Sequence, residues 1–160
     1  MHSLALRTLK RPGSSEPGPT QAARVSLDFV VDGDSLLAQL IKVDGGHGDF
    51  MGCFVQGFDS ENRRKQAQLL EAGSPDTEEG RYLLYVCPEC GDIGCGAYGA
   101  KIRIAEETVE WYEFAYETGY EPGRSLPSIG PFSFARVEYE QAMQMAGAAQ
   151  IAISSATPLR

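Results

Sequence analysis

Apolar and polar positions begin to alternate regularly at residue 25, as they do along a half-buried β-strand. The apolar members of this alternation are Val25, Leu27, Phe29 and Val31. Asp32-Gly33 ends the strand, and apolar residues then recur at three- and four-residue spacing, which is typical of a helix. Asp34 or Ser35 is placed to cap this helix, whose apolar positions are Leu36, Leu37, Leu40 and Ile41.

A second strand is predicted over residues 50–58, where aromatic and β-branched side chains stand between glycines. Residues 61–71 are mainly good helix formers, so a second helix follows. Asp59 or Ser60 is its expected cap, and Gly73 with the following proline is its expected stop.

The strand period returns after residue 80 and predicts three consecutive strands over residues 82–86, 97–104 and 108–116. Short connections between them imply an antiparallel meander. A long loop over residues 119–131 leads to a final helix, capped by Ser133 and ending near residue 149. The side chains expected to face inward from this helix are Phe134, Val137, Ala142 and Met145.

The sequence therefore predicts an α+β fold in which an antiparallel β-meander of about five strands packs with two to three helices. A length of 160 residues with 42% hydrophobic residues suits one domain, expected over residues 24–149. Residues 1–23 are expected to be a flexible leader, because the run KRPGSSEPGPTQ offers almost no apolar surface to bury. Residues 150–160 are expected to be a frayed C-terminal tail.

The formal net charge of −8 opposes binding to phosphate backbones and to anionic lipid, so nucleic acid and membrane surfaces are not expected partners. The charge is uneven along the chain. Four basic residues oppose only Glu16 in the first 24 residues, a net of +3, which leaves −11 for residues 25–160. Such an acidic body suits a basic protein partner, although the same charge also serves as a solvated surface that keeps the protein soluble.

A cytoplasmic location is expected, because the chain lacks both a run of about 18 apolar residues and the apolar core of a secretory signal. Leu4, Leu6 and Leu9 alternate with basic residues as in a transit peptide, but Pro12 cuts this segment short. In a reducing compartment, four cysteines of which three lie within nine residues are typical of metal ligands or reactive thiols rather than of a disulfide framework.

The three clustered cysteines lie in the connection between the first two meander strands, in the run Cys87-Pro-Glu-Cys90-Gly-Asp-Ile-Gly-Cys95-Gly. Cysteines at C-x2-C spacing can share one tetrahedral ion, because a tight turn aims both sulfurs inward. Gly91 suits such a turn, and Cys95 is close enough to act as a third ligand. The cluster predicts a structural zinc site.

A fourth zinc ligand must come from elsewhere in the chain. Cys53 and His47 are the leading candidates, since the stretch that contains them can end near the mouth of the hairpin. Asp92 or a water molecule can also complete the site.

The cysteines also allow readings other than zinc. They can pack as small apolar groups in a metal-free turn, form a redox C-x2-C pair, or hold an iron-sulfur cluster with Cys53 as the fourth soft ligand. Cys95 or Cys53 with His47 as a base is a minimal set for acyl transfer. The best sequence-level candidates for a binding surface are those aromatic residues near Trp111 that remain exposed.

Three motifs resemble those of a family of uncharacterised bacterial proteins. They are the turn Cys90-Gly91-Asp92-Ile93-Gly94-Cys95, the run Trp111-Tyr-Glu-Phe114, and Gly130-Pro-Phe-Ser-Phe134 followed by Tyr139. The resemblance covers residues 81–146 and implies a small α+β domain, without an activity that can be carried over.

Two hypotheses of different classes follow. The first is a small, acidic, non-enzymatic binding protein, such as one of the immunity type, which neutralises a basic partner protein and uses the cysteine cluster for structure. The second is a metal- or thiol-dependent enzyme, redox or hydrolytic, that acts at the cluster.

Overall fold

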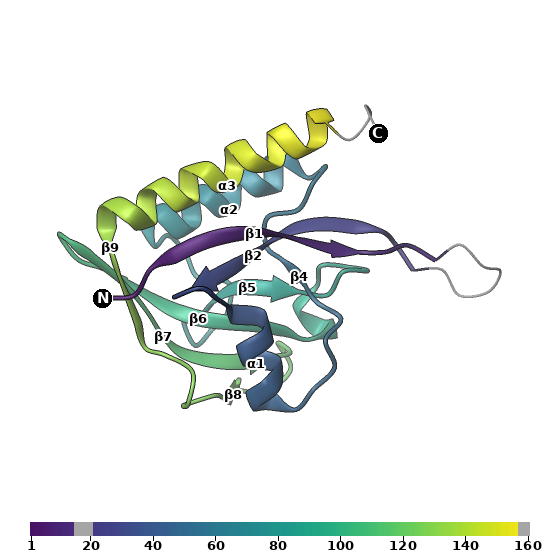
Figure 1. The fold of residues 1–160 in the computed structure, drawn as a ribbon. Helices are drawn as coiled ribbons and strands as arrows, with labels where there is room; N and C mark the ends of the chain where they lie inside the picture. The colour runs from purple at the N-terminus through teal and green to yellow at the C-terminus, as the bar shows by residue number, and fades with distance from the viewer. Residues whose placement is uncertain (15–20, 157–160) are drawn as a thin grey trace.

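Two antiparallel sheets and three helices make up the computed structural model, which describes residues 1–14 and 21–156 (Figure 1). The smaller sheet contains, in order, β1 (Leu4–Arg11), β2 (Arg24–Val31) and β3 (Asp34–Ser35). The larger sheet contains β4 (Met51–Gly52), β5 (Tyr82–Val86), β6 (Ala97–Ile104), β7 (Thr108–Glu117) and β8 (Arg124–Ser125), with β9 (Phe132–Ala135) also paired to β7. The helices are α1 (Leu36–Asp44), α2 (Asp59–Glu71) and α3 (Arg136–Ala156).

The predicted α+β class is confirmed, and the predicted meander is the run β5, β6 and β7. The sheets contain more strands than the five expected. The additional strands are short or lie outside the predicted domain, so alternation along the sequence gave little sign of them.

The expectation of a flexible leader over residues 1–23 is wrong for its first half, because Leu4–Arg11 forms β1 and pairs with β2 along its full length. Leu4 is buried, and Leu6 and Leu9 pack against the core. The strand forms because β2 supplies hydrogen-bond partners and apolar contacts to it. The sequence of residues 4–11 alone does not reveal these long-range contacts. Residues 15–20 lie outside the described residues.

The strand expected over residues 50–58 is reduced to the two residues of β4. There the chain crosses β2 so closely that a Cβ atom on Gly52 would lie 1.8 Å from the carbonyl oxygen of Leu27. Gly52 also donates its backbone N–H to the hydroxyl of Ser26. This close crossing joins the two sheets and requires glycine.

Helix ends agree with the sequence at α1 and differ at the other two helices. Ser35 caps α1 by accepting a hydrogen bond from the backbone N–H of Ala38. Neither Asp59 nor Ser60 caps α2, whose N-cap residue is Phe58. Ser133 lies in β9 rather than capping the last helix, which begins at Arg136.

The C-terminal helix also differs from its prediction in length and orientation. The expected tail over residues 150–160 is wrong in part, because α3 continues to Ala156, and residues 157–160 lie outside the described residues. Phe134 and Ala142 are buried as expected, whereas Val137 and Met145 are exposed. Among the side chains of α3 whose burial the structure describes, those of residues 136–147, the buried ones are Tyr139, Ala142, Met143 and Ala146.

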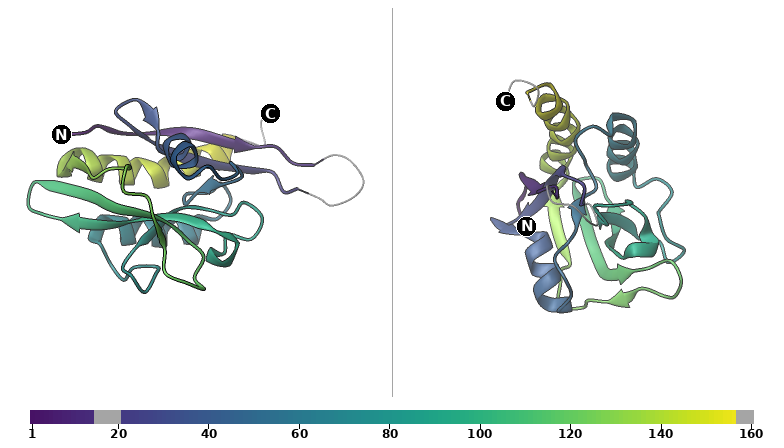
Figure 2. Two further views of the ribbon diagram at one scale, coloured as in Figure 1. Left: turned by 90° about the horizontal axis from the view of Figure 1, so that it is seen from below. Right: turned by 90° about the vertical axis from the view of Figure 1, so that its right-hand side faces the viewer.

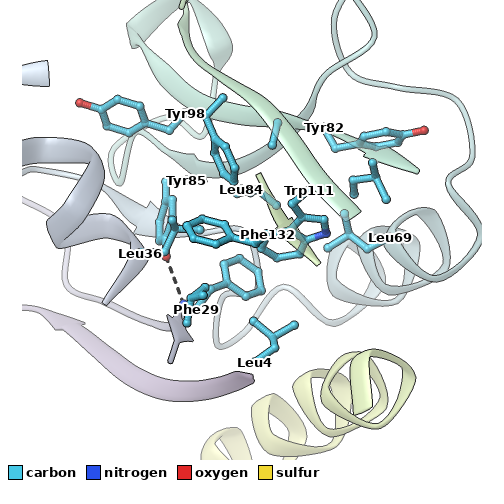
Figure 3. Close-up of a cluster of buried hydrophobic side chains, with 14 of the residues drawn as sticks. Leu4, Phe29, Leu36, Leu69, Tyr82, Leu84, Tyr85, Tyr98, Trp111 and Phe132 are labelled. Atoms are coloured by element: carbon cyan, nitrogen blue, oxygen red, sulfur yellow. Dashed lines mark hydrogen bonds between the residues drawn. The ribbon is translucent and has the colours of Figure 1, made fainter. Parts of the chain in front are cut away.

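A bulge in β7 explains how Trp111 and Phe114, three residues apart, both face the core. The register of β6 with β7 shifts between Gly99 and Lys101, and Glu113 takes a positive φ of 50°. The guanidinium of Arg81 donates to the carbonyl of Glu113 and supports this backbone. Figure 3 shows Trp111 inside the resulting core, with Phe29 and Leu69 nearby.

Helices α2 and α3 lie side by side over one edge of the molecule (Figures 1 and 2). The hydroxyl of Tyr139 donates to the carbonyl of Leu69, and the amide of Gln66 donates to the carbonyl of Met143. Among the residues the structure describes, no helix combines the length and apolar character needed to cross a membrane.

Candidate metal centre

The cysteine cluster lies at the end of β5, in a tight turn followed by one turn of 3-10 helix (Ile93–Cys95). The N–H of Gly91, which has a φ of 67°, donates to the carbonyl of Cys87 over 2.8 Å. The N–H of Asp92 donates to the sulfur of Cys90 over 3.4 Å. Backbone donors thus face sulfur, as they do where a turn stabilises thiolate ligands of a metal.

This turn brings together the three cysteines that the sequence singled out. The Sγ atoms of Cys87, Cys90 and Cys95 all lie within 4.8 Å of one another. Those of Cys90 and Cys95 are 2.8 Å apart, which is longer than the roughly 2.05 Å of a disulfide bond. In a tetrahedral zinc site, Zn–S bonds of about 2.3 Å place sulfur atoms about 3.8 Å apart. Small side-chain rotations therefore suffice to place the three thiolates around one ion.

The three thiols influence one another's ionisation. Burial opposes ionisation of Cys87, but hydrogen bonds from the backbone N–H groups of Cys90 and Glu89 and from the other two thiols outweigh it and lower the Cys87 pKa. The pKa of Cys95 is raised to about 12, first because its thiol donates to Cys90 and then because of desolvation and the proximity of Cys87. Ionisation of all three thiols together would therefore require a nearby cation.

Cys53, one of the two predicted fourth ligands, lies outside this three-sulfur group. It is half-buried and packs against the hydrophobic core, and its backbone N–H donates to the carbonyl of Leu84. Burial raises the pKa of its thiol to about 11. Cys53 behaves as a small apolar residue in this position.

His47, the other predicted fourth ligand, is also outside the group. Its ring stacks on Phe50, and its Nδ1 accepts the backbone N–H of Asp49. It lines a cavity of about 210 Å³ in which Asp44 accepts hydrogen bonds from Tyr98 and Arg124. Across residues 1–14 and 21–156, no further His, Cys, Asp or Glu joins the three cysteines.

The structure reveals an attachment of the cysteine turn that the sequence analysis missed. Glu89, between the first two cysteines, accepts hydrogen bonds from the guanidinium of Arg11 and from the backbone N–H of Ala22. The carbonyl of Pro88 accepts a third from Arg24. The turn therefore holds the far end of the β1–β2 hairpin. The sequence could not predict this contact, because Arg11 was expected to lie in a flexible leader and no pattern in the sequence links it to Glu89.

Two tyrosines hold the other side of the loop. A Cβ atom on Gly96, whose φ is 98°, would lie 2.0 Å from the hydroxyl of Tyr116, and one on Gly94 would lie 2.7 Å from that of Tyr120. Gly96 is therefore required by its positive φ and by the close approach of Tyr116, whereas the ring of Tyr120 can move away from a side chain at position 94. Tyr120 remains 83% exposed, so it belongs to the surface beside the loop.

Two acidic residues of the third meander strand, β7, form ion pairs with basic residues of β6. Glu110 and Glu113 form ion pairs with Arg103 and Lys101. Trp111 and Phe114 of the same strand are buried core residues and so are not part of a binding surface.

No protein-family model, curated protein or solved structure matches the chain. The class of site is therefore defined by its own chemistry: three cysteines that can hold a metal ion, exposed at Cys90 and Cys95.

Proposed function

We propose that the protein is a small, non-enzymatic binding protein of the immunity type, which neutralises a basic partner protein. In this proposal Cys87, Cys90 and Cys95 hold a structural zinc ion. The three-sulfur geometry and the N–H groups directed at sulfur support a metal of this kind. A reducing compartment such as the cytoplasm fits four cysteines that are all free thiols.

An acidic cleft beside the cysteine loop is the observation that carries the partner proposal. The cleft has a volume of about 500 Å³, and its lining includes Ile93 of the cysteine loop and the exposed ring of Tyr120. Its acidic lining residues are Asp76, Glu78, Glu79, Glu117 and Glu121.

Part of the charge in this cleft is available to a partner. Arg81 pairs with Glu79 and Glu117 inside the protein, whereas Glu78 and Glu121 form no ion pair with any described residue. A lysine or arginine side chain of a partner can contact these two carboxylates and lie over the face of Tyr120. The cleft therefore fits a basic protein surface.

Co-purification from native lysate followed by rebinding of the isolated components tests this proposal. The double variant Glu78→Lys/Glu121→Lys should weaken rebinding at least about tenfold, since each lost charge pair at an interface contributes on the order of 1 kcal/mol or more. The control Glu71→Lys/Glu106→Lys has the same net charge but alters acids outside the cleft, and it should bind as the wild type does. Absence of a stoichiometric basic partner, or equal loss in both variants, would contradict the proposal.

A metal- or thiol-dependent enzyme acting at the cluster is the second candidate. It is favoured by the exposure of Cys90 and Cys95, which makes their sulfur atoms reachable by a substrate. Alkylation rates with iodoacetamide separate the two candidates. Inert, metal-bound thiols would eliminate the enzyme, whereas rapid modification of one thiol in the metal-loaded protein would favour it over the binding protein.

A further inference from the structure

The cysteine centre provides three protein ligands, and zinc in proteins is almost always four-coordinate. Glu89 and Asp92, the acidic residues nearest to the cysteines in sequence, do not supply the fourth ligand. Glu89 is held by Arg11 and by the backbone of Ala22, and the carboxylate of Asp92 lies beside Gly94. Cys53 and His47 are also outside the group, so none of the residues that the structure describes fills the fourth position, and a ligand from another molecule can occupy it.

The position of this fourth site follows from the exposure of the ligands. Cys90 and Cys95 are exposed, and Cys87 is half-buried at the end of β5. A ligand can therefore approach from the solvent side, past Cys90 and Cys95. The 3-10 turn that carries Cys95 also carries Ile93, which lines the acidic cleft.

Charge selects the chemistry of that ligand. A zinc ion with three thiolates has a net charge of −1. The exposed carboxylate of Asp92 lies in the same loop, and Glu121 lines the adjacent cleft together with Ile93. Arg11 and Arg24, which contact this turn, already donate to Glu89 and to the carbonyl of Pro88. A fourth thiolate or a carboxylate adds another negative charge to this region. A neutral nitrogen donor adds none, and imidazole completes the well-known Cys3His type of zinc site.

We propose that the fourth coordination position of the Cys87, Cys90 and Cys95 centre binds a neutral imidazole nitrogen supplied by a histidine of another molecule. This inference rests on the metal centre of the proposed function and goes beyond it, because it assigns an open, ligand-binding position to a site proposed as structural. A histidine in the basic partner, or His47 of a second copy of this chain, can supply the same donor.

Cobalt(II) substitution tests the inference, with imidazole as the probe. Cobalt bound by Cys87, Cys90 and Cys95 should show thiolate charge-transfer absorption, and imidazole should shift its ligand-field bands in a saturable manner with one site per chain. Acetate and 2-mercaptoethanol should bind at least about tenfold more weakly than imidazole. The variant Asp92→Asn/Glu121→Gln should reduce the difference in affinity between imidazole and the two anionic ligands, since it removes negative charges that disfavour anions. Cys53→Ser is the control and should behave as the wild type does.

The outcomes separate this inference from the proposed function. Failure of cobalt to bind, or binding that Cys90→Ser leaves unchanged, would overturn the metal centre and with it the inference. Three-thiolate absorption that imidazole does not shift, or that thiol shifts more readily, would overturn the inference alone.

The source of the imidazole is resolved by sedimentation equilibrium on the cobalt-loaded protein. A dimer that His47→Ala converts to a monomer would support the inference with a second copy as the source. A monomer with the imidazole response would support it with a different protein as the source.

Discussion

The aromatic core and the cysteine loop of this protein are ordered by different forces. In the core, Phe29, Trp111 and Tyr139 are fully buried, and Trp111 meets the other two rings edge to face. In the loop, no residue of Ile93–Cys95 is buried, and the order comes from hydrogen bonds to sulfur and carbonyl groups. Burial of apolar area stabilises the core by itself, whereas the loop has little buried apolar area and contains three cysteines that could hold a metal ion.

Cys53 makes the same contrast within one residue type. It packs against the core with a raised pKa, while Cys90 and Cys95 lie exposed in the loop. The surroundings of a cysteine thus decide whether it acts as an apolar side chain or as a ligand. The predictions below test whether the two regions are as separate as this comparison implies.

Replacement of Trp111 by alanine has the largest expected effect. It removes the central ring of the core and should lower the free energy of unfolding by about 3–5 kcal/mol in urea titrations. Tyr120→Ala, which truncates an 83% exposed aromatic ring, is the matched control and should change stability by less than about 0.5 kcal/mol. Equal effects of the two variants would contradict the assignment of the core.

The buried ion pair of Lys65 and Asp76 should make an intermediate, pH-dependent contribution. Partial burial opposes ionisation of Asp76, but Lys65, 2.8 Å away, and donors from Leu83 and Gln68 outweigh it and lower the Asp76 pKa. This stabilisation is therefore present above the unfolded-state pKa of about 3.9 and is lost as pH falls through the lower folded-state pKa.

Asp76→Asn should lower stability by about 1–3 kcal/mol at neutral pH, because it leaves Lys65 without its charged partner. The variant should also flatten the decline in stability between about pH 5 and pH 2. Asp34→Asn, which replaces an exposed carboxylate, is the control and should leave both stability at neutral pH and its decline at low pH nearly unchanged. A pH profile of Asp76→Asn that parallels that of the wild type would show that this pair does not contribute.

The smallest effect is expected where the loop meets the β1–β2 hairpin. Glu89→Ala removes the acceptor for Arg11 and for the backbone N–H of Ala22, so amide exchange at Ala22 should become a few-fold faster by NMR. Removal of the proposed metal should have the same effect, because that ion would fix the turn that contains Glu89. The amide of Leu27, which donates to Phe54 at the crossing of the sheets, should be unaffected. An unchanged amide exchange rate at Ala22 in both cases would show that the cysteine loop does not stabilise the β1–β2 hairpin.

Local patterns were sufficient to predict the meander, the position of α1 with a cap at Asp34 or Ser35, and the grouping of three cysteines. These features depend on alternation, capping and spacing between neighbours in sequence. The three-cysteine group follows from one turn, so its geometry could be predicted without knowledge of the rest of the fold.

The features that could not be predicted depend on residues far apart in the sequence. Leu4–Arg11 is a strand only because Arg24–Val31 pairs with it, and the bulge at Glu113 depends on support from Arg81. The sequence predicts Cys53 and His47 as metal ligands because the stretch that contains them can end near the mouth of the hairpin. Their actual positions are fixed by the core and by Phe50, respectively.

The metal content of the purified protein tests the central claim most directly. The account predicts about one zinc ion per chain, lost on unfolding, abolished by Cys87→Ser, Cys90→Ser or Cys95→Ser, and retained in Cys53→Ser. X-ray absorption at the zinc edge should then report three sulfur neighbours and one nitrogen or oxygen neighbour. A metal-free protein whose stability is unchanged in chelator would contradict the account and favour a packed, metal-free turn.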